Sequence, residues 1–118
     1  QEVWSARFIG AAPADLEARA ALRSVDALRE AFDSSHGVMR RFIASLDEEA
    51  LAGEFSYVDT KGISQRRVLW QTMLHVVNHG THHRAEAAML LTSLGHGPRQ
   101  LDYVFYEIER AGGEPRLT

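Results

Sequence analysis

Four of the six histidines of this 118-residue chain lie in one segment, Leu74-His75-Val76-Val77-Asn78-His79-Gly80-Thr81-His82-His83-Arg84-Ala85-Glu86. It lies inside the longest segment with helical patterning, which runs from about Arg67 to Leu94 and is followed by Gly95, a residue suited to end a helix. At 1.5 Å per residue this helix would be about 40 Å long, as in a helical bundle. Its apolar stripe consists of Leu69, Met73, Val76, Ala87, Leu91 and Leu94.

The histidines of this segment share one face of the expected helix. Each residue advances by about 100°, so with His75 at zero the others follow at about 40° (His79), −20° (His82), 80° (His83) and 20° (Glu86). Five groups able to bind a metal therefore fall within a wedge of about 100°. The apolar stripe centres near about 130°, so we expect His79 and His83 at the edge of the buried face.

The spacing of His79 and His83 suits a shared metal ion. Side chains four residues apart on a helix lie about 6 Å apart, so two imidazoles can bind one ion at about 2.1 Å each. A catalytic metal generally has three protein ligands and an open position, so we expect the third ligand from another helix. Gly80 costs about 1 kcal/mol of helix propensity relative to alanine, and would allow another helix backbone to approach.

The neighbouring polar residues have alternative interpretations. His75 and His82 are expected to lie in solvent or to support the ligands rather than to bind the ion. Glu86, about one turn beyond His83, can bind the ion, accept a hydrogen bond from an imidazole, or pair with an arginine on the surface.

The rest of the chain is expected to be mostly helical, with a connector and one strand-like segment. Residues 1–9 are predicted to be the end of a longer helix, because neither a capping residue nor an initiator methionine precedes them. Residues 11–23 are predicted as a connector, residues 24–46 as a long helix beginning at Ser24, and residues 101–111 as a last helix. Phe55 and Tyr57 alternate with polar residues before Lys61-Gly62, which indicates a small hairpin or extended loop. We predict one all-α domain over residues 1–118, a helical bundle.

Composition excludes several classes of protein and site. The chain has no cysteine, which excludes disulfides, a thiolate nucleophile and a zinc site built on sulfur. A formal net charge of −3 argues against nucleic acid as a partner. No apolar run approaches the roughly 20 residues of a membrane span, and no signal-peptide pattern opens the chain. We therefore expect a cytoplasmic protein with neither nucleic-acid nor membrane partners.

The segment from Leu69-Trp70 to Arg84 resembles the signature helix of the DinB-like superfamily of metal-binding four-helix bundles. The segments from Phe55-Ser56-Tyr57 to Gly62 and from Leu94-Gly95 to Leu101-Asp102 are also similar to the layout of that family. The resemblance implies a DinB-like four-helix bundle with a small hairpin or extended loop before the metal-binding helix. It also implies that the first helix and most of the second are missing from this chain.

The resemblance also implies a set of metal ligands. In that family two ligands come from Asn-His-x-x-x-His, here Asn78, His79 and His83, and a third histidine stands just upstream of a segment resembling Glu2-Val3-Trp4. A divalent metal, zinc or nickel, would be bound by the three histidines and water. The family often continues Arg-Gly-Gln after the last histidine, where this chain has Arg84-Ala85-Glu86. Candidates for supporting the ligands or contacting substrate are His75, Asn78, Arg84 and Glu86.

The function implied by the resemblance is metal-dependent thiol chemistry. Relatives include transferases that use bacillithiol, mycothiol or similar low-molecular-weight thiols, and a thiol-dependent isomerase. A metal holds a coordinated thiol as thiolate, which supplies the nucleophile that a cysteine-free chain lacks. We therefore expect a homodimeric metal-dependent thiol S-transferase or hydrolase that acts on a small-molecule substrate. The alternatives are a non-catalytic metal-binding stress-response bundle and a helical interaction module with solvated histidines.

Overall fold

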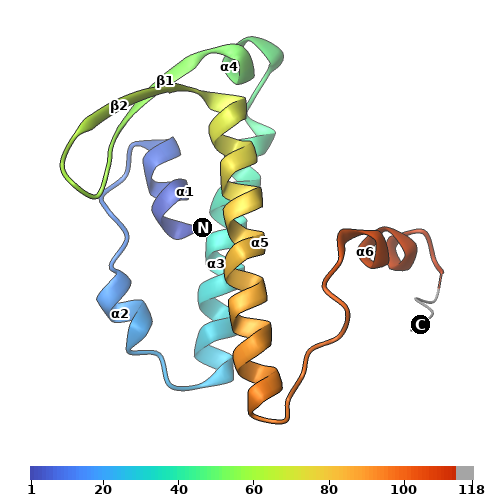
Figure 1. The fold of residues 1–118 in the computed structure, drawn as a ribbon. Helices are drawn as coiled ribbons and strands as arrows, with labels where there is room; N and C mark the ends of the chain where they lie inside the picture. Colours follow the sequence, from blue (N-terminus) through green and yellow to red (C-terminus); the bar gives the residue numbers. More distant parts are fainter. Residues whose placement is uncertain (114–118) are drawn as a thin grey trace. The chain divides into compact units, whose positions relative to one another are not determined.

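The computed structural model describes residues 1–113, and residues 114–118 lie outside the described part. The chain divides into two compact units, residues 1–77 and 78–118. The described residues form helices and one antiparallel two-stranded sheet (Figure 1). Their bounds are α1 (Glu2–Ile9), α2 (Leu16–Ala20), α3 (Val25–Ala44), α4 (Glu48–Ala52), β1 (Glu54–Val58), β2 (Ser64–Val68), α5 (Leu69–Ser93) and α6 (Tyr103–Arg110). The predicted, mostly helical fold with one small hairpin is confirmed, whereas the four-helix bundle is not established.

Short polar side chains set the starts of three helices. The carboxylates of Asp15 and Asp47 each accept a hydrogen bond of 2.8 Å from a backbone N–H three residues later, at the starts of α2 and α4. The hydroxyl of Ser24 accepts one of 3.1 Å from Ala27 N at the start of α3, as predicted. At the other end of α1, Gly10 ends the helix in the left-handed conformation, with φ of 64°.

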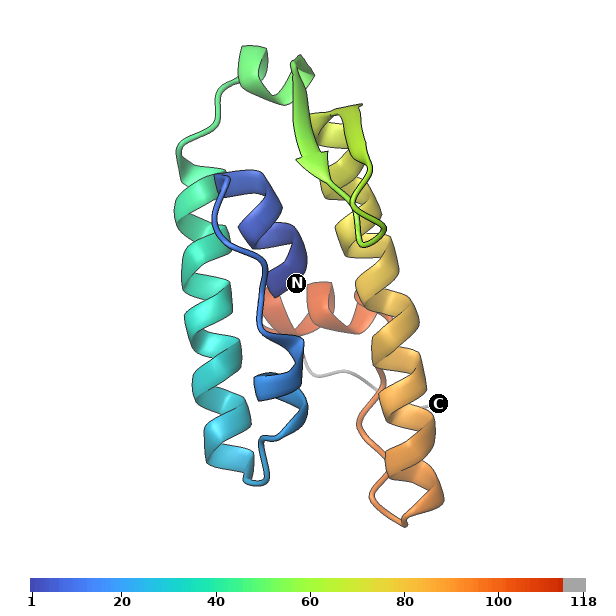
Figure 2. The same ribbon diagram turned by 90° about the vertical axis from the view of Figure 1, so that its left-hand side faces the viewer.

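Aromatic rings hold the first unit together. The ring of Phe8 on α1 stacks on Phe42 of α3 at 5.2 Å between centroids and lies 5.3 Å from Phe55 of β1. Trp4, one turn before Phe8, lies 5.2 Å from Tyr57 of β1. Figure 2 shows α1 beside the C-terminal half of α3, the half that contains Phe42. Trp4 and Phe8, four residues apart and so on one face of α1, thus join α1 to α3 and to the sheet.

The hairpin fixes the start of the histidine-bearing helix. Its strands pair with Phe55 opposite Arg67 and Tyr57 opposite Gln65, so both aromatic side chains lie on the same face. The second strand continues directly into α5, and Leu69 N donates a hydrogen bond of 2.9 Å to Gly53 O. Leu69 is buried, with 6% of its surface exposed. The first turn of α5 is therefore anchored by both the sheet and the core of the first unit.

The apolar stripe predicted for α5 is buried only near its start. Leu69 and Thr72 are buried, but Leu91 and Leu94 are 44% and 71% exposed. None of the described helices is both long enough and apolar enough to cross a membrane.

Asp59 organises the turn between β1 and β2. Its Oδ1 accepts hydrogen bonds from Lys61 N at 2.9 Å and Ile63 N at 3.0 Å, and its Oδ2 accepts one from Gln65 Nε2 at 3.0 Å. The hydrogen bond from Ile63 N is the main cause that lowers the pKa of Asp59, followed by the one from Gln65. These hydrogen bonds therefore favour the ionised form of the carboxylate.

We predict that Asp59→Asn lowers the melting temperature by a few degrees at pH 7, because the amide lacks the charge that strengthens these hydrogen bonds. A lowered folded-state pKa stabilises the fold above the unfolded-state pKa of about 3.9. This stabilisation is lost as the pH falls through the folded-state value, so the difference from the parent protein should shrink toward pH 2. Thermal unfolding followed by circular dichroism at both pH values measures it. Asp33→Asn, at an exposed position of α3, is the matched control, and an equal effect of both substitutions would contradict the prediction.

Candidate metal centre

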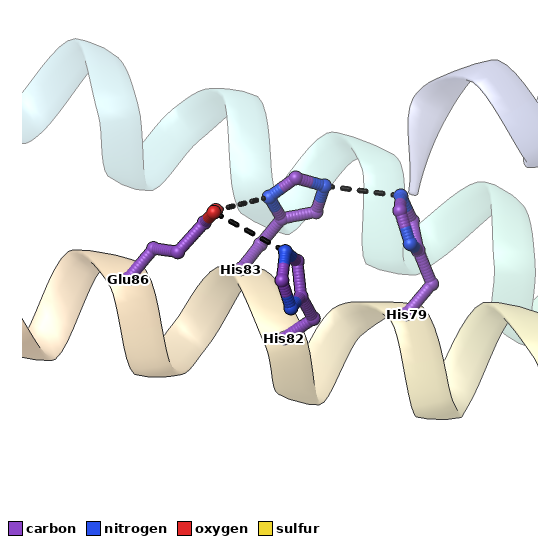
Figure 3. Close-up of polar contacts among 4 residues, drawn as sticks. All are labelled: His79, His82, His83 and Glu86. Atoms are coloured by element: carbon purple, nitrogen blue, oxygen red, sulfur yellow. Dashed lines mark hydrogen bonds and ion pairs between the residues drawn. The ribbon is translucent and has the colours of Figure 1, made fainter.

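His79 and His83 bring two ring nitrogens together on one face of α5. They lie one helical turn apart, and His83 Nε2 is 3.0 Å from His79 Nε2 (Figure 3). The ring planes are nearly perpendicular, at 83°, with centroids 4.5 Å apart. The structure therefore places the two histidines that the sequence paired with their Nε2 atoms facing each other.

Glu86 holds His83 from the opposite side of the ring. Its Oε2 lies 2.8 Å from His83 Nδ1, and its Oε1 lies 3.2 Å from His82 Nε2 (Figure 3). An ionised carboxylate only accepts, so Nδ1 of His83 is the donor of this hydrogen bond. In the neutral ring the lone pair of His83 then lies on Nε2, the atom that faces His79.

The contacts of Glu86 favour the ionised form of its carboxyl group. The hydrogen bond from His83 is the main cause that lowers the pKa of Glu86, and the neighbouring His82, His83 and His79 add favourable electrostatic interactions. Among the three roles considered for Glu86, the structure shows the acceptor of imidazole hydrogen bonds. His82, which the sequence placed in solvent or in support of the ligands, shares this carboxylate with His83.

The expectation that the pair lies at the edge of a buried face is wrong. His79 is exposed, and the side chain of His83 is 61% exposed. The expectation assumed that the whole apolar stripe of α5 is covered, whereas the helix is buried only near Leu69 and Thr72. The side chains of the pair are therefore accessible to solvent.

The separation of the two nitrogens suits a shared cation. Two nitrogens that are each about 2.1 Å from one ion lie about 3.0 Å apart at a right angle and about 3.4 Å apart at the tetrahedral angle. The observed 3.0 Å falls at the lower end of this range. Within residues 1–113 there is no group of three or more His, Cys, Asp or Glu side chains arranged to hold a metal ion. The arrangement is thus that of a two-histidine donor pair.

Gly80 and Arg84 form a local arrangement that the sequence interpretation missed. Arg84 donates a hydrogen bond of 2.9 Å to Thr81 Oγ1. A Cβ atom at Gly80 would lie only 2.9 Å from a guanidinium nitrogen of Arg84. The glycine therefore leaves room for the Arg84 side chain to fold back along its own helix.

His75 and Asn78 are the remaining candidates from the sequence. The ring of His75 is 5.3 Å from that of Trp4, at 66°, so His75 extends the aromatic contacts of the first unit. Asn78, directly before His79, is exposed.

The histidine-bearing helix belongs to a chain with one clear family match. No curated protein and no solved structure matches the chain significantly. The sequence model described as the DinB family matches residues 1–116, which is nearly the whole chain. The resemblance drawn from the histidine segment is confirmed, and the chain belongs to the DinB family.

Proposed function

We propose that this DinB-family protein is a thiol S-transferase that binds a divalent metal ion through His79 and His83 and uses the ion in catalysis. The observation that carries the proposal is the facing pair of Nε2 atoms, 3.0 Å apart on adjacent turns of α5. Imidazole nitrogens suit zinc and nickel, the two metals that we expect. Since two histidines leave several coordination positions, water, substrate or a further protein group would complete the site.

The chain's own residues would prepare the pair for an ion. Glu86 accepts a hydrogen bond from Nδ1–H of His83, which orients the ring and fixes its tautomer. In the metal-free protein, the contact between the two Nε2 atoms requires one shared proton, and His79 Nε2–H donates it to His83. A cation between the rings would take the place of this proton.

The proposed reaction joins the sulfur of a small thiol to an electrophilic small molecule. A bound divalent ion lowers the pKa of a thiol that coordinates it and keeps the sulfur as a nucleophilic thiolate. The chain has no cysteine, so this thiol is a separate cosubstrate of low molecular weight. The sulfur–carbon bond forms as the leaving group departs, and the thiol proton passes to solvent. Because the histidine side chains are exposed, both reactants can approach them from solution.

We expect His79→Ala and His83→Ala each to weaken binding of zinc or nickel at least about a hundredfold, because either change leaves a single imidazole donor. Isothermal titration calorimetry and metal analysis of the dialysed protein measure the affinity and the stoichiometry. His96→Ala, which removes a histidine outside α5, is the control and should bind as the parent does. Unchanged metal content in the first two variants would instead support a helical interaction module with solvated histidines.

Glu86→Gln should weaken metal binding about tenfold to a hundredfold, the usual effect of losing a carboxylate partner of a ligating histidine. The melting temperature of the metal-free protein should stay within about one degree, since the carboxylate is half exposed. Glu30→Gln, at an exposed position of α3, is the matched control. Equal metal affinity in the Glu86 variant and the parent would show that the carboxylate does not position His83 for the ion.

The metal-loaded protein should conjugate a small thiol to monochlorobimane faster than the free metal and thiol do together. Cysteine, glutathione, bacillithiol and mycothiol are the thiols to compare, and product fluorescence measures the rate. His79→Ala should lower the protein-dependent rate at least about a hundredfold, along with metal affinity. Stoichiometric metal binding without turnover, with protein atoms at all four coordination positions, would favour the alternative of a non-catalytic metal-binding stress-response bundle.

A further inference from the structure

The pair of His79 and His83 supplies half of the ligands that protein-bound zinc usually has. Zinc is generally bound by four donor atoms in a tetrahedral arrangement, and the pair presents two facing Nε2 atoms. Within residues 1–113 no group of three or more His, Cys, Asp or Glu side chains is arranged to hold a metal ion. A zinc ion on this pair would therefore have two positions open to water or to donors of another molecule.

The surface of α5 around the pair carries few charges and has exposed apolar side chains. Only two of the 25 residues of the helix are Asp, Glu, Lys or Arg. Leu90 lies at about 60° on the helical wheel, between His79 and His83. Leu90 is 62% exposed, and Leu94, directly after the helix, is 71% exposed. Imidazoles flanked by exposed leucines suit contact with another protein surface.

The charge of Glu86 indicates which protein surface fits. Its carboxylate holds Nδ1 of His83 at 2.8 Å and is half exposed (Figure 3). If a second copy of the same face met the first, two carboxylates would lie near one divalent ion, and the charges would cancel. Without the ion, the two carboxylates would repel each other. A second copy is therefore complementary to this face only when the ion is present.

We propose that two copies of this chain share one zinc ion, to which each copy contributes His79 and His83 from the same face of α5. The inference rests on the metal binding proposed above and gives that site a closed form. Because the same face meets itself, a two-fold axis passes through the ion, and four imidazole nitrogens occupy its tetrahedral positions. No position is then left for a thiol, whereas an ion held by one copy keeps two. The ratio of metal to chain thus regulates access to the centre.

Sedimentation velocity of the full chain, with zinc added in steps, tests whether the ion is shared. We expect a monomer without zinc, a dimer at half an equivalent of zinc, and a return to the monomer in excess zinc, where each copy holds its own ion. A chelator should restore the monomer from the dimer, since the carboxylates then repel each other. A sedimentation coefficient that does not change between the metal-free protein and half an equivalent of zinc would overturn the proposal.

Substitutions assign the dimer to the histidine face of α5. His83→Ala should abolish the dimer at half an equivalent of zinc, whereas His96→Ala, outside the helix, should dimerise as the parent does. Leu90→Glu adds two carboxylates to the shared face, so the dimer should weaken at least about tenfold, while the zinc affinity of a single copy stays within about fivefold. Val77→Glu is the matched control, because Val77 is 64% exposed and lies about 140° from the pair on the wheel. Equal dimerisation of the two glutamate variants, or a dimer of His83→Ala, would overturn the assignment.

The same titration separates the shared ion from the proposed transferase. Binding of one zinc ion per chain by a protein that stays monomeric at every ratio would overturn the shared ion and leave the transferase proposal standing. A zinc-bridged dimer without conjugation of monochlorobimane at any ratio would support the shared ion and contradict the transferase. Where both hold, the rate per bound zinc ion should rise at least about tenfold between half an equivalent and excess zinc, because only an unshared ion has positions for the thiol. No zinc binding at all would overturn both.

Discussion

The candidate centre depends on a chain of contacts through one imidazole ring, that of His83. Glu86 occupies Nδ1 of this ring at 2.8 Å, and His79 faces Nε2 at 3.0 Å. Because the carboxylate takes the proton-bearing nitrogen, the other nitrogen presents its lone pair to His79. Without Glu86 the ring could adopt the opposite tautomer, and Nε2 would then carry a proton at the position of the proposed ion. The two-histidine pair is therefore a three-residue unit in which the carboxylate decides which nitrogen is available.

Features that depend on neighbouring residues could be predicted from the sequence, whereas features that depend on distant segments could not. The positions of His79, His83 and Glu86 on one helical face follow from a rotation of about 100° per residue, so they could be predicted from spacing alone. The alternation around Phe55 and Tyr57 likewise identified the hairpin. These features depend on residues close together in the chain, where backbone geometry leaves few alternatives.

The burial of α5 could not be predicted in the same way, because burial depends on segments distant in the chain. The apolar stripe of α5 has helical spacing along its whole length, but the buried residues of the helix, Leu69 and Thr72, both lie in its first turn. The surroundings of Gly80 also differ from those expected from the sequence. Its sequence context suggested a close helix, while the structure places the Arg84 guanidinium over it. Periodicity identifies the face of a helix that is able to pack, and long-range contacts decide how much of it does.

The local origin of the donor pair also determines how the centre should respond to change. Residues 79–86 lie within one continuous helix, and the contacts between His79, His83 and Glu86 join neighbouring turns of that helix. Their geometry is therefore maintained by backbone hydrogen bonds of α5, whereas the aromatic contacts of Phe8 and Trp4 maintain the first unit. A substitution that loosens the aromatic contacts should reduce stability before it alters the spacing of the two nitrogens. Under the proposed function, we therefore expect metal affinity and thermal stability to be separable, with metal affinity depending on Glu86 and thermal stability on the aromatic contacts of the first unit.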